Sequence, residues 1–159
     1  MILHIDSDAS YLSEPEACSR TRGHYYLRSL PTDPKKSPNL PPPENGTIHT
    51  ECRILKHVGA SAGEVEVRGL FHNGQIAVTL IITLLELGFT QPPTPIKTDN
   101  SAAKGIFTAK VRQKWIKAMD MQFYWMKDMV KQKNFFVYWK LGSKNMGGLF
   151  HKTSPTASP

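Results

Sequence analysis

Apolar and polar residues are spaced along this chain in two patterns, one typical of strands and one typical of helices. In residues 47–55 (TIHTECRIL), Ile48, Thr50, Cys52 and Ile54 alternate with His49, Glu51 and Arg53. A period of two is the pattern of a half-buried strand. Four more short β-prone segments are expected as strands, at residues 2–6, 23–27, 95–99 and 134–140.

Helical spacing begins at Ser61 and continues to Leu87. Ser61 is placed to cap this helix, and Glu64 three residues later completes a capping box. Asn73 and Gly74 weaken its middle. Apolar residues recur along one side, namely Leu70, Ala77, Ile81, Leu84 and Leu85. Two further helices are predicted at residues 101–111 and 114–131.

The order of these elements predicts an α/β fold. Three strands, a helix, a strand, two helices and a strand give a mixed five-stranded sheet flanked by helices. We expect the first three strands to pair antiparallel in sequence order, and the fourth to lie parallel to the first. One domain is expected over residues 1–152, with a Pro-rich exposed loop at 29–46 and a disordered tail at 153–159.

Charge adds a candidate partner. The chain has 159 residues and a formal net charge of +7, and residues 110–144 hold nine Lys or Arg against two Asp. A basic excess of this kind favours a nucleic acid partner. Aromatic residues are interleaved with these lysines and can either stack on bases or belong to the core, namely Trp115, Tyr124, Trp125 and Trp139.

Several classes of protein are disfavoured. Cys18 and Cys52 form no C-x-x-C pair, so neither a disulfide framework nor a thiolate zinc site is indicated. The scattered histidines match no metal-ligand spacing. The N-terminus lacks the pattern of a secretory signal, and the most apolar run, residues 76–87, is too short to cross a bilayer. We therefore expect an intracellular protein, in the cytoplasm or nucleus, with no membrane partner.

Two acidic residues follow short apolar runs. Asp6 ends the first predicted strand and Asp99 ends the fourth. If these strands are neighbours, their ends converge, and two carboxylates at such a place would bind a divalent cation. The alternative is that both aspartates only cap or turn the chain at strand ends.

The long helix offers a third carboxylate. Residues 64 and 66 point about 200° apart on a helix, so only one of them can face the sheet. Glu66 shares the side of Leu70 and Ala77, which favours it as the ligand. Glu64 is the alternative, although it is also placed for an ordinary i,i+4 pair with Arg68.

Five blocks, in order, resemble the ribonuclease H domain of copia-type LTR-retrotransposon polyproteins, which follows reverse transcriptase. "HIDSDASYLSEPEACSRTRGHYYL" resembles the opening strand with its acid and the Ser/Arg/Gly-rich second strand. "SAGEVEVRGL" resembles the helix motif S-[SA]-x-E-x-E, and "IKTDNSAAKGI" the strand with its DN motif. "KAMDMQFYWMKDMV" and "NMGGLFHK" resemble two later blocks.

The resemblance implies a ribonuclease H-like fold and a hydrolytic site. Asp6, Glu66 and Asp99 would be catalytic and would bind two Mg²⁺ ions, for which Mn²⁺ can substitute. The implied reaction is endonucleolytic cleavage of the RNA strand of an RNA·DNA hybrid by two-metal hydrolysis. The implied partners are the hybrid and an adjacent reverse transcriptase domain.

One departure from the family pattern concerns Gly148. The family's fourth acid, in the motif N-[LM]-A-D-x-[FL]-T-K, falls on this glycine, so a degenerate and weakened site is expected. The alternative is an inactive retroelement remnant that only binds nucleic acid. A DNA-cutting transposase or integrase core would place its third acid late in the chain, and residues 141–159 contain no Asp or Glu.

Overall fold

The computed structural model describes residues 1–29, 44–100 and 117–139 of the chain. Its strands form one five-stranded sheet in the order β3-β2-β1-β4-β5. The strands are β1 (Ile2–Ser10), β2 (Ser19–Arg28), β3 (Glu44–Leu55), β4 (Thr94–Thr98) and β5 (Phe135–Trp139). The predicted mixed sheet is confirmed.

The strand pairing also follows the prediction. β1 pairs antiparallel with β2, and β2 pairs antiparallel with β3. β1 lies parallel to β4, with Ile5 opposite Ile96 and Asp6 opposite Lys97, and β4 lies parallel to β5. Because parallel strands end at the same edge of a sheet, the carboxyl ends of β1 and β4 lie together.

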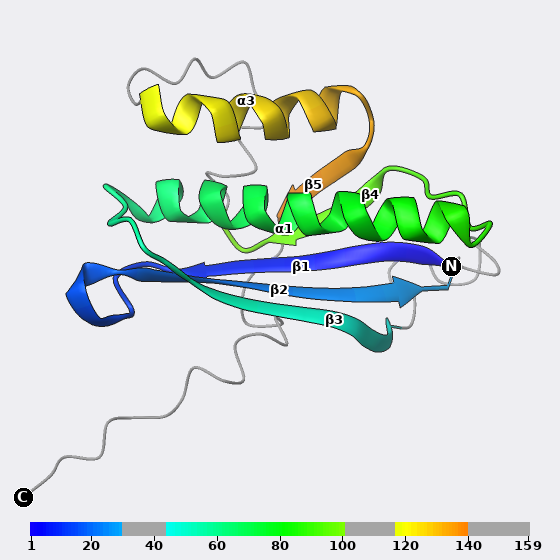
Figure 1. The fold of residues 1–159 in the computed structure, drawn as a ribbon, viewed down its shortest axis with the longest axis horizontal. Coiled ribbons are helices and arrows are strands. Elements are labelled where there is room, and N and C mark those ends of the chain that lie inside the picture. The colour runs from blue at the N-terminus through cyan, green and yellow to red at the C-terminus, as the bar shows by residue number, and fades with distance from the viewer. Residues whose placement is uncertain (30–43, 101–116, 140–159) are drawn as a thin grey trace, which may run out of the picture.

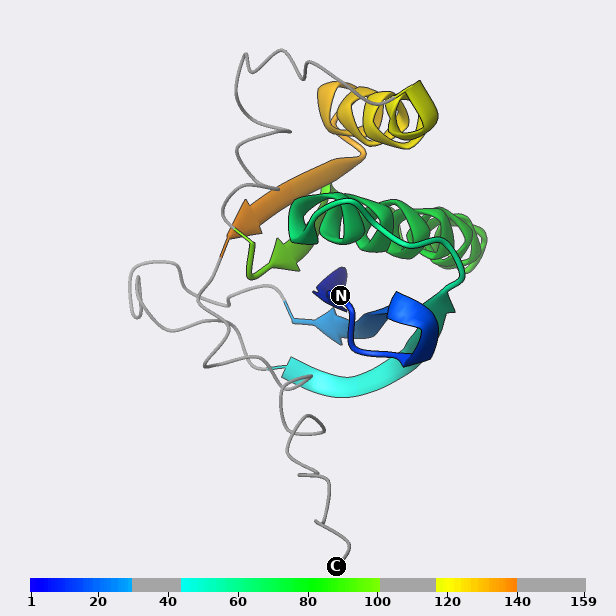
Figure 2. The ribbon, with the colours of Figure 1, turned by 90° about the vertical axis from the view of Figure 1, so that its left-hand side faces the viewer.

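Two long helices cover one face of the sheet. α1 (Ala62–Glu86) packs on β1 and β2, and α3 (Lys117–Lys131) lies alongside α1 and contacts β5 (Figures 1 and 2). Ser61 caps α1, since its hydroxyl accepts from the Glu64 backbone N–H at 3.2 Å. Residues 101–111, predicted as a helix, and residues 114–116 lie outside the described residues.

The core sits between the sheet and these helices. Each fully buried aliphatic or aromatic side chain contributes about 1.5–3 kcal/mol relative to exposure. The buried cluster includes residues of β1, β2, β4, β5, α1 and α3, namely Leu3, Ile5, Tyr25, Val67, Leu70, Ala77, Ile96, Phe123, Met126, Phe135 and Val137. It fixes α1 against β1 and β4.

Asn73 and Gly74 have packing roles in the middle of α1. The buried Asn73 amide donates to Ser7 Oγ at 2.8 Å and to the Arg22 carbonyl at 2.9 Å, and Tyr25 donates to its Oδ1 at 3.0 Å. A Cβ at Gly74 would lie 3.0 Å from Met126 Sδ, so the glycine allows close approach of α3. Both residues have a low helix propensity, and both make or allow tertiary contacts that a better helix former would not.

Three strand predictions differ from the structure. β1 continues to Ser10 and β2 begins at Ser19, so both strands are longer than expected. β3 begins at Glu44, inside the expected loop. The face of β3 that carries Ile48 and Ile54 is exposed, because β3 is an edge strand whose His49 packs on Tyr25 instead.

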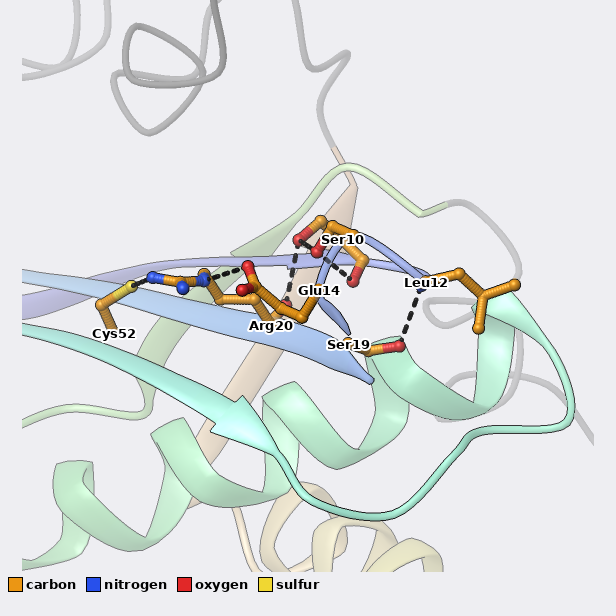
Figure 3. Close-up of polar contacts among 7 residues, drawn as sticks. Ser10, Leu12, Glu14, Ser19, Arg20 and Cys52 are labelled. Atoms are coloured by element: carbon orange, nitrogen blue, oxygen red, sulfur yellow. Dashed lines mark hydrogen bonds and ion pairs between the residues drawn. The ribbon is translucent and has the colours of Figure 1, made fainter. Parts of the chain in front are cut away.

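The extended β1–β2 hairpin is closed by polar contacts (Figure 3). Arg20 donates to Glu14 Oε1 at 2.6 Å and to Cys52 Sγ of β3 at 3.4 Å. The Leu12 backbone N–H donates to Ser19 Oγ at 3.1 Å. β1 itself runs past Asp6 because it stays paired with β2, with Ser7 opposite Gly23 and Ser10 opposite Arg20.

By length and composition alone, α1 could cross a membrane. Its buried side chains instead pack on the sheet and α3 as a core helix would, while Ile82 and Leu85 near its C-terminal end are exposed.

Candidate functional site

Glu66 lies at the centre of the acidic site. It is in the second turn of α1, faces the sheet and is 2% exposed. Its Oε1 accepts from Thr98 Oγ1 at 2.6 Å, and its carboxylate also accepts a hydrogen bond from the Ala9 backbone N–H. The Glu66 carboxylate is therefore held between the carboxyl-terminal ends of β1 and β4.

The two residues that hold Glu66 each adjoin an aspartate. Ala9 follows Asp8 in β1, and Thr98 precedes Asp99 at the end of β4. The parallel pairing of β1 and β4 ends at Asp6 and Lys97, two residues before Asp8 and Asp99, and the charges of both of these aspartates act on Glu66. The site therefore contains three acids, Asp8, Glu66 and Asp99.

The pKa values of two of these acids reflect their surroundings. Burial raises the pKa of Glu66 to about 8, against the opposing hydrogen bond from Thr98, and the charges of Asp99 and Asp8 raise it further. The pKa of Asp99 is also raised, by burial first and then by the charge of Asp8. A cation placed among these carboxylates would oppose both shifts.

Glu64 has a structural environment. Its Oε2 accepts from the Ala60 backbone N–H at 2.8 Å, and its Oε1 accepts from Arg68 at 2.7 Å. The predicted i,i+4 pair with Arg68 is confirmed. These contacts use both carboxylate oxygens of Glu64. Within the described residues, no hydrogen bond or ion pair joins Glu64 to Asp8 or Asp99.

Asp6 lies in a different environment from the one expected. The prediction that it ends its strand is wrong, because β1 continues to Ser10. Its Oδ2 accepts from Lys97 Nζ at 2.8 Å, and its Oδ1 accepts from Tyr26 at 2.9 Å. That Asp6 is a metal ligand stays a prediction. It requires the Lys97 ammonium to move away from the Asp6 carboxylate.

Asp8 is the acid that the sequence reasoning missed. The motif Asp6-Ser7-Asp8 places two aspartates on one face of a strand, because side chains alternate. Only the length of β1 decides which of them lies level with Asp99. The polar residues after Asp6 hid that length, since an apolar alternation was the signal for the strand.

The three carboxylates of the site can be compared with the ligands that the predicted Mg²⁺ or Mn²⁺ would need. Carboxylate oxygens are the ligands that Mg²⁺ and Mn²⁺ prefer, so the chemistry of Asp8, Glu66 and Asp99 fits such a cation. Within the described ranges, however, no three His, Cys, Asp or Glu side chains gather closely enough to hold a metal. Gly148, the position of the missing fourth acid, lies outside them.

The basic and aromatic stretch is only partly described. Trp125 packs against the core, and Trp139 Nε1 donates to the Asp99 carbonyl at 2.8 Å. Tyr124 is exposed and Lys127 lies over the Phe123 ring. Trp115 lies outside the described residues, together with Lys110, Arg112, Lys114, Lys140 and Lys144.

Comparisons with solved structures identify the fold. The chain superposes on LC11-RNase H1, solved in complex with an RNA/DNA hybrid, with a TM-score of 0.60 and 11% identity over 91% of this chain and 89% of that one. It also superposes on the N-terminal RNase H domain of a Mycobacterium tuberculosis protein, with a TM-score of 0.59 and 11% identity over 91% of this chain and 86% of that one.

A viral structure is similar as well. A foamy viral protease-reverse transcriptase, solved in complex with dsDNA, gives a TM-score of 0.55 and 13% identity over 92% of this chain and 85% of that one. No family model and no curated protein matches the sequence. Similarity at these identities establishes the fold alone: the chain has a ribonuclease H-like fold.

Proposed function

We propose that this domain is a ribonuclease H-type endonuclease that cleaves the RNA strand of RNA·DNA hybrids. One observation carries the proposal. In a ribonuclease H-like fold, the Glu66 carboxylate is held by Ala9 and Thr98, which adjoin Asp8 and Asp99 at the carboxyl ends of two neighbouring parallel strands. Ligand sites in α/β sheets gather at such strand ends.

The proposed ligands are Asp8, Glu66 and Asp99, with Mg²⁺ or Mn²⁺ as the cofactor. A bound divalent ion supplies charge neutralisation at the phosphate and lowers the pKa of a bound water. Thr98 and Ala9 orient Glu66, so its carboxylate does not have to be ordered when a cation binds. Trp139 fixes the backbone of Asp99 through its carbonyl.

Asp8 replaces Asp6 in this proposal for a reason of charge. Asp6 already has a buried ammonium partner, Lys97, and a hydroxyl partner, Tyr26. Separating a buried ion pair by removing one partner costs about 3–5 kcal/mol. Asp8 adjoins the peptide that holds Glu66 and faces no such loss.

We further propose a copia-type retroelement origin, on the sequence blocks described above. An adjacent reverse transcriptase domain and an intracellular location follow from that origin as proposals. The glycine at position 148 weakens the site by one carboxylate. The second candidate function is a remnant that binds nucleic acid without cleaving it, and the same glycine favours it.

A cleavage assay tests the proposed function. Purified protein is incubated with an RNA·DNA hybrid labelled on the RNA strand, in Mg²⁺ or Mn²⁺, beside Asp8→Asn, Asp6→Asn, Glu66→Gln, Glu64→Gln and Asp99→Asn. We expect cleavage that is lost in the variants at 8, 66 and 99 and retained in those at 6 and 64. Cleavage is measured at a temperature at which circular dichroism shows every variant folded, because Asp6→Asn leaves Lys97 buried without its carboxylate.

Other outcomes decide between the alternatives. Loss of cleavage in Asp6→Asn with full activity in Asp8→Asn would restore Asp6 as the ligand. Hybrid binding without cleavage by the wild-type protein in either metal would favour the inactive remnant. Cleavage that persists in all three acid variants would refute the site.

A further inference from the structure

A basic cleft lies on the flank of α1 beside β3. It has a volume of about 770 Å³ and is lined by the end of β3, the residues after it, α1 and α3. Of the eight described residues that line it, three carry a positive charge, Arg53, Lys56 and Arg68, two are histidines, His57 and His72, and none is acidic. The cleft is separate from the Asp8, Glu66 and Asp99 site, because none of its lining residues belongs to that site.

The acids nearest the cleft are on its border. Glu51 accepts from Arg53 at 3.2 Å, and Glu64 accepts from Arg68 at 2.7 Å. These pairs fix the two guanidinium groups in place while each keeps further N–H donors, since a guanidinium has five. Lys56 is exposed and forms no described ion pair, so its charge faces the cleft without a described counterion.

The electrostatic environment inside the cleft agrees with its lining. Burial lowers the pKa of His72, and the charges of Arg53 and Arg68 lower it further, against the weaker opposite effect of Glu51. His72 is therefore neutral near pH 7 and can serve as a hydrogen-bonding group. A second cavity of about 250 Å³ shares Arg53 and His72 with the cleft, and its other lining residues include Glu51 and Thr79.

The position of the cleft relates it to the acidic site. Arg68 and His72 come two and six residues after Glu66 on α1. At 1.5 Å per residue these separations are about 3 and 9 Å along the helix axis. Around the helix, however, Arg68 points about 200° and His72 about 120° away from Glu66, so the cleft lies on a different side of α1 from the acidic site.

We propose that the cleft lined by Arg53, Lys56, Arg68 and His72 binds the sugar-phosphate backbone of a nucleic acid. This inference rests on the proposed function for the identity of the substrate. Arginine forks and a lysine ammonium suit phosphate oxygens, and such contacts hold a strand in register without reading its sequence. The cleft acts as a positioning site.

Binding without cleavage tests the inference. Fluorescence anisotropy measures the affinity for a labelled RNA·DNA hybrid and for duplex DNA in EDTA, over a range of salt concentrations. The variants are Lys56→Gln and Arg53→Gln, with Lys131→Gln as a control that removes one charge at the end of α3 outside the cleft.

The expected result is specific to the cleft. The association constant falls with salt, and each lost phosphate contact makes the slope of log K against log salt less negative by about 0.9. This corresponds to roughly fivefold to tenfold weaker binding at 0.1 M salt. We expect this in Lys56→Gln and Arg53→Gln, and a smaller change in Lys131→Gln. Equal affinity and slope in the wild-type and cleft variants would overturn the inference and leave the proposed cleavage intact.

Two more results separate the cleft from the enzyme. If the cleft variants weaken binding but the wild-type protein never cleaves a hybrid, the cleft is supported and the proposed activity fails. If the wild-type protein binds neither nucleic acid, the cleft inference is overturned as well.

Discussion

Lys97 Nζ lies 2.8 Å from Asp6 Oδ2, and both side chains are buried, with 5% and 11% of their surfaces exposed. Asp6 and Lys97 face each other across the parallel pair of β1 and β4. We predict that Lys97→Met destabilises the fold by about 3–5 kcal/mol, because it leaves a buried carboxylate without its cation. Urea unfolding of both proteins at pH 7 measures the difference.

The double variant Asp6→Asn/Lys97→Met is the control for this pair. An amide can still accept from Tyr26, and no charge remains buried without a partner. We expect it to recover most of the loss, as replacement of a buried ion pair by neutral groups often does. A double variant as unstable as Lys97→Met would mean that packing of the lysine chain, and not charge, holds this position.

The pH dependence of stability provides a second prediction, at Glu66. Its pKa of about 8 in the folded state lies above the ordinary value of 4.5, so the folded state keeps a proton that the unfolded state loses. This contribution to stability is fully present below pH 4.5 and is lost as the pH rises to about 8. Stability in EDTA should therefore fall over that range, by an amount on the order of a few kcal/mol.

Glu66→Gln removes the titrating group and keeps an acceptor for Thr98. We expect its unfolding free energy to fall less between pH 5 and pH 9 than that of the wild type. A residual fall is expected from Asp99, whose pKa is raised in the same direction. Identical pH profiles of the two proteins, measured by urea unfolding, would contradict the assigned environment of Glu66.

The sheet could be predicted well because its signals are local. β-prone segments, apolar alternation and helical spacing predicted the five described strands and the helices α1 and α3, and the parallel pairing of β1 with β4 followed from the crossover helix between β3 and β4. The short 3-10 helix at Pro15–Ala17 was not predicted. Ser61 and the Glu64–Arg68 pair followed from spacing alone. Glu66 was placed on the sheet side of α1 by the same reasoning.

The register of the acids could not be predicted in this way. It depends on how β1 pairs with β2 and β4, with Ser10 opposite Arg20 and Asp6 opposite Lys97, and the pairing with β4 joins segments that are distant in the sequence. The partner of Asp6 was equally hidden, because Lys97 is distant in the sequence. A lysine inside a short apolar strand was a usable signal, since buried lysines require an acid.

A third prediction concerns two glycines in α1. A Cβ at Gly69 would lie 2.7 Å from Thr21 Oγ1, whereas a Cβ at Gly63 would meet only Ser61 Oγ, at 3.9 Å. Gly69→Ala should destabilise the protein, since overpacking costs about 1–3 kcal/mol against a gain in helix propensity of about 1 kcal/mol. Gly63→Ala should stabilise it by up to about 1 kcal/mol.

Thermal unfolding distinguishes these two variants. The melting temperature should fall in Gly69→Ala and rise or stay constant in Gly63→Ala. A rise in both would indicate that Thr21 can turn its hydroxyl away from α1 without loss.

The last prediction concerns Gly148, which lies outside the described residues. If Asp8, Glu66 and Asp99 form the site, the glycine leaves it one hard oxygen donor short of the pattern that the sequence resembles. Cleavage should suffer more than binding, since phosphate contacts elsewhere, including the basic cleft, still hold the hybrid. Gly148→Asp should therefore raise RNA cleavage at least tenfold, equivalent to about 1.4 kcal/mol of barrier, with little change in affinity.

Gly147→Asp is the matched control, because it adds the same charge one position earlier in the chain. We expect it to leave the cleavage rate near that of the wild type, since the aligned position of the missing acid is 148. Rates are measured with hybrid in excess, in Mg²⁺ and in Mn²⁺, and affinities in EDTA. Equal and high activity in the wild-type and Gly148→Asp proteins would show that a fourth acid is unnecessary or comes from another residue. Inactivity of both, with the fold intact and the hybrid still bound, would favour the remnant that binds nucleic acid without cleaving it.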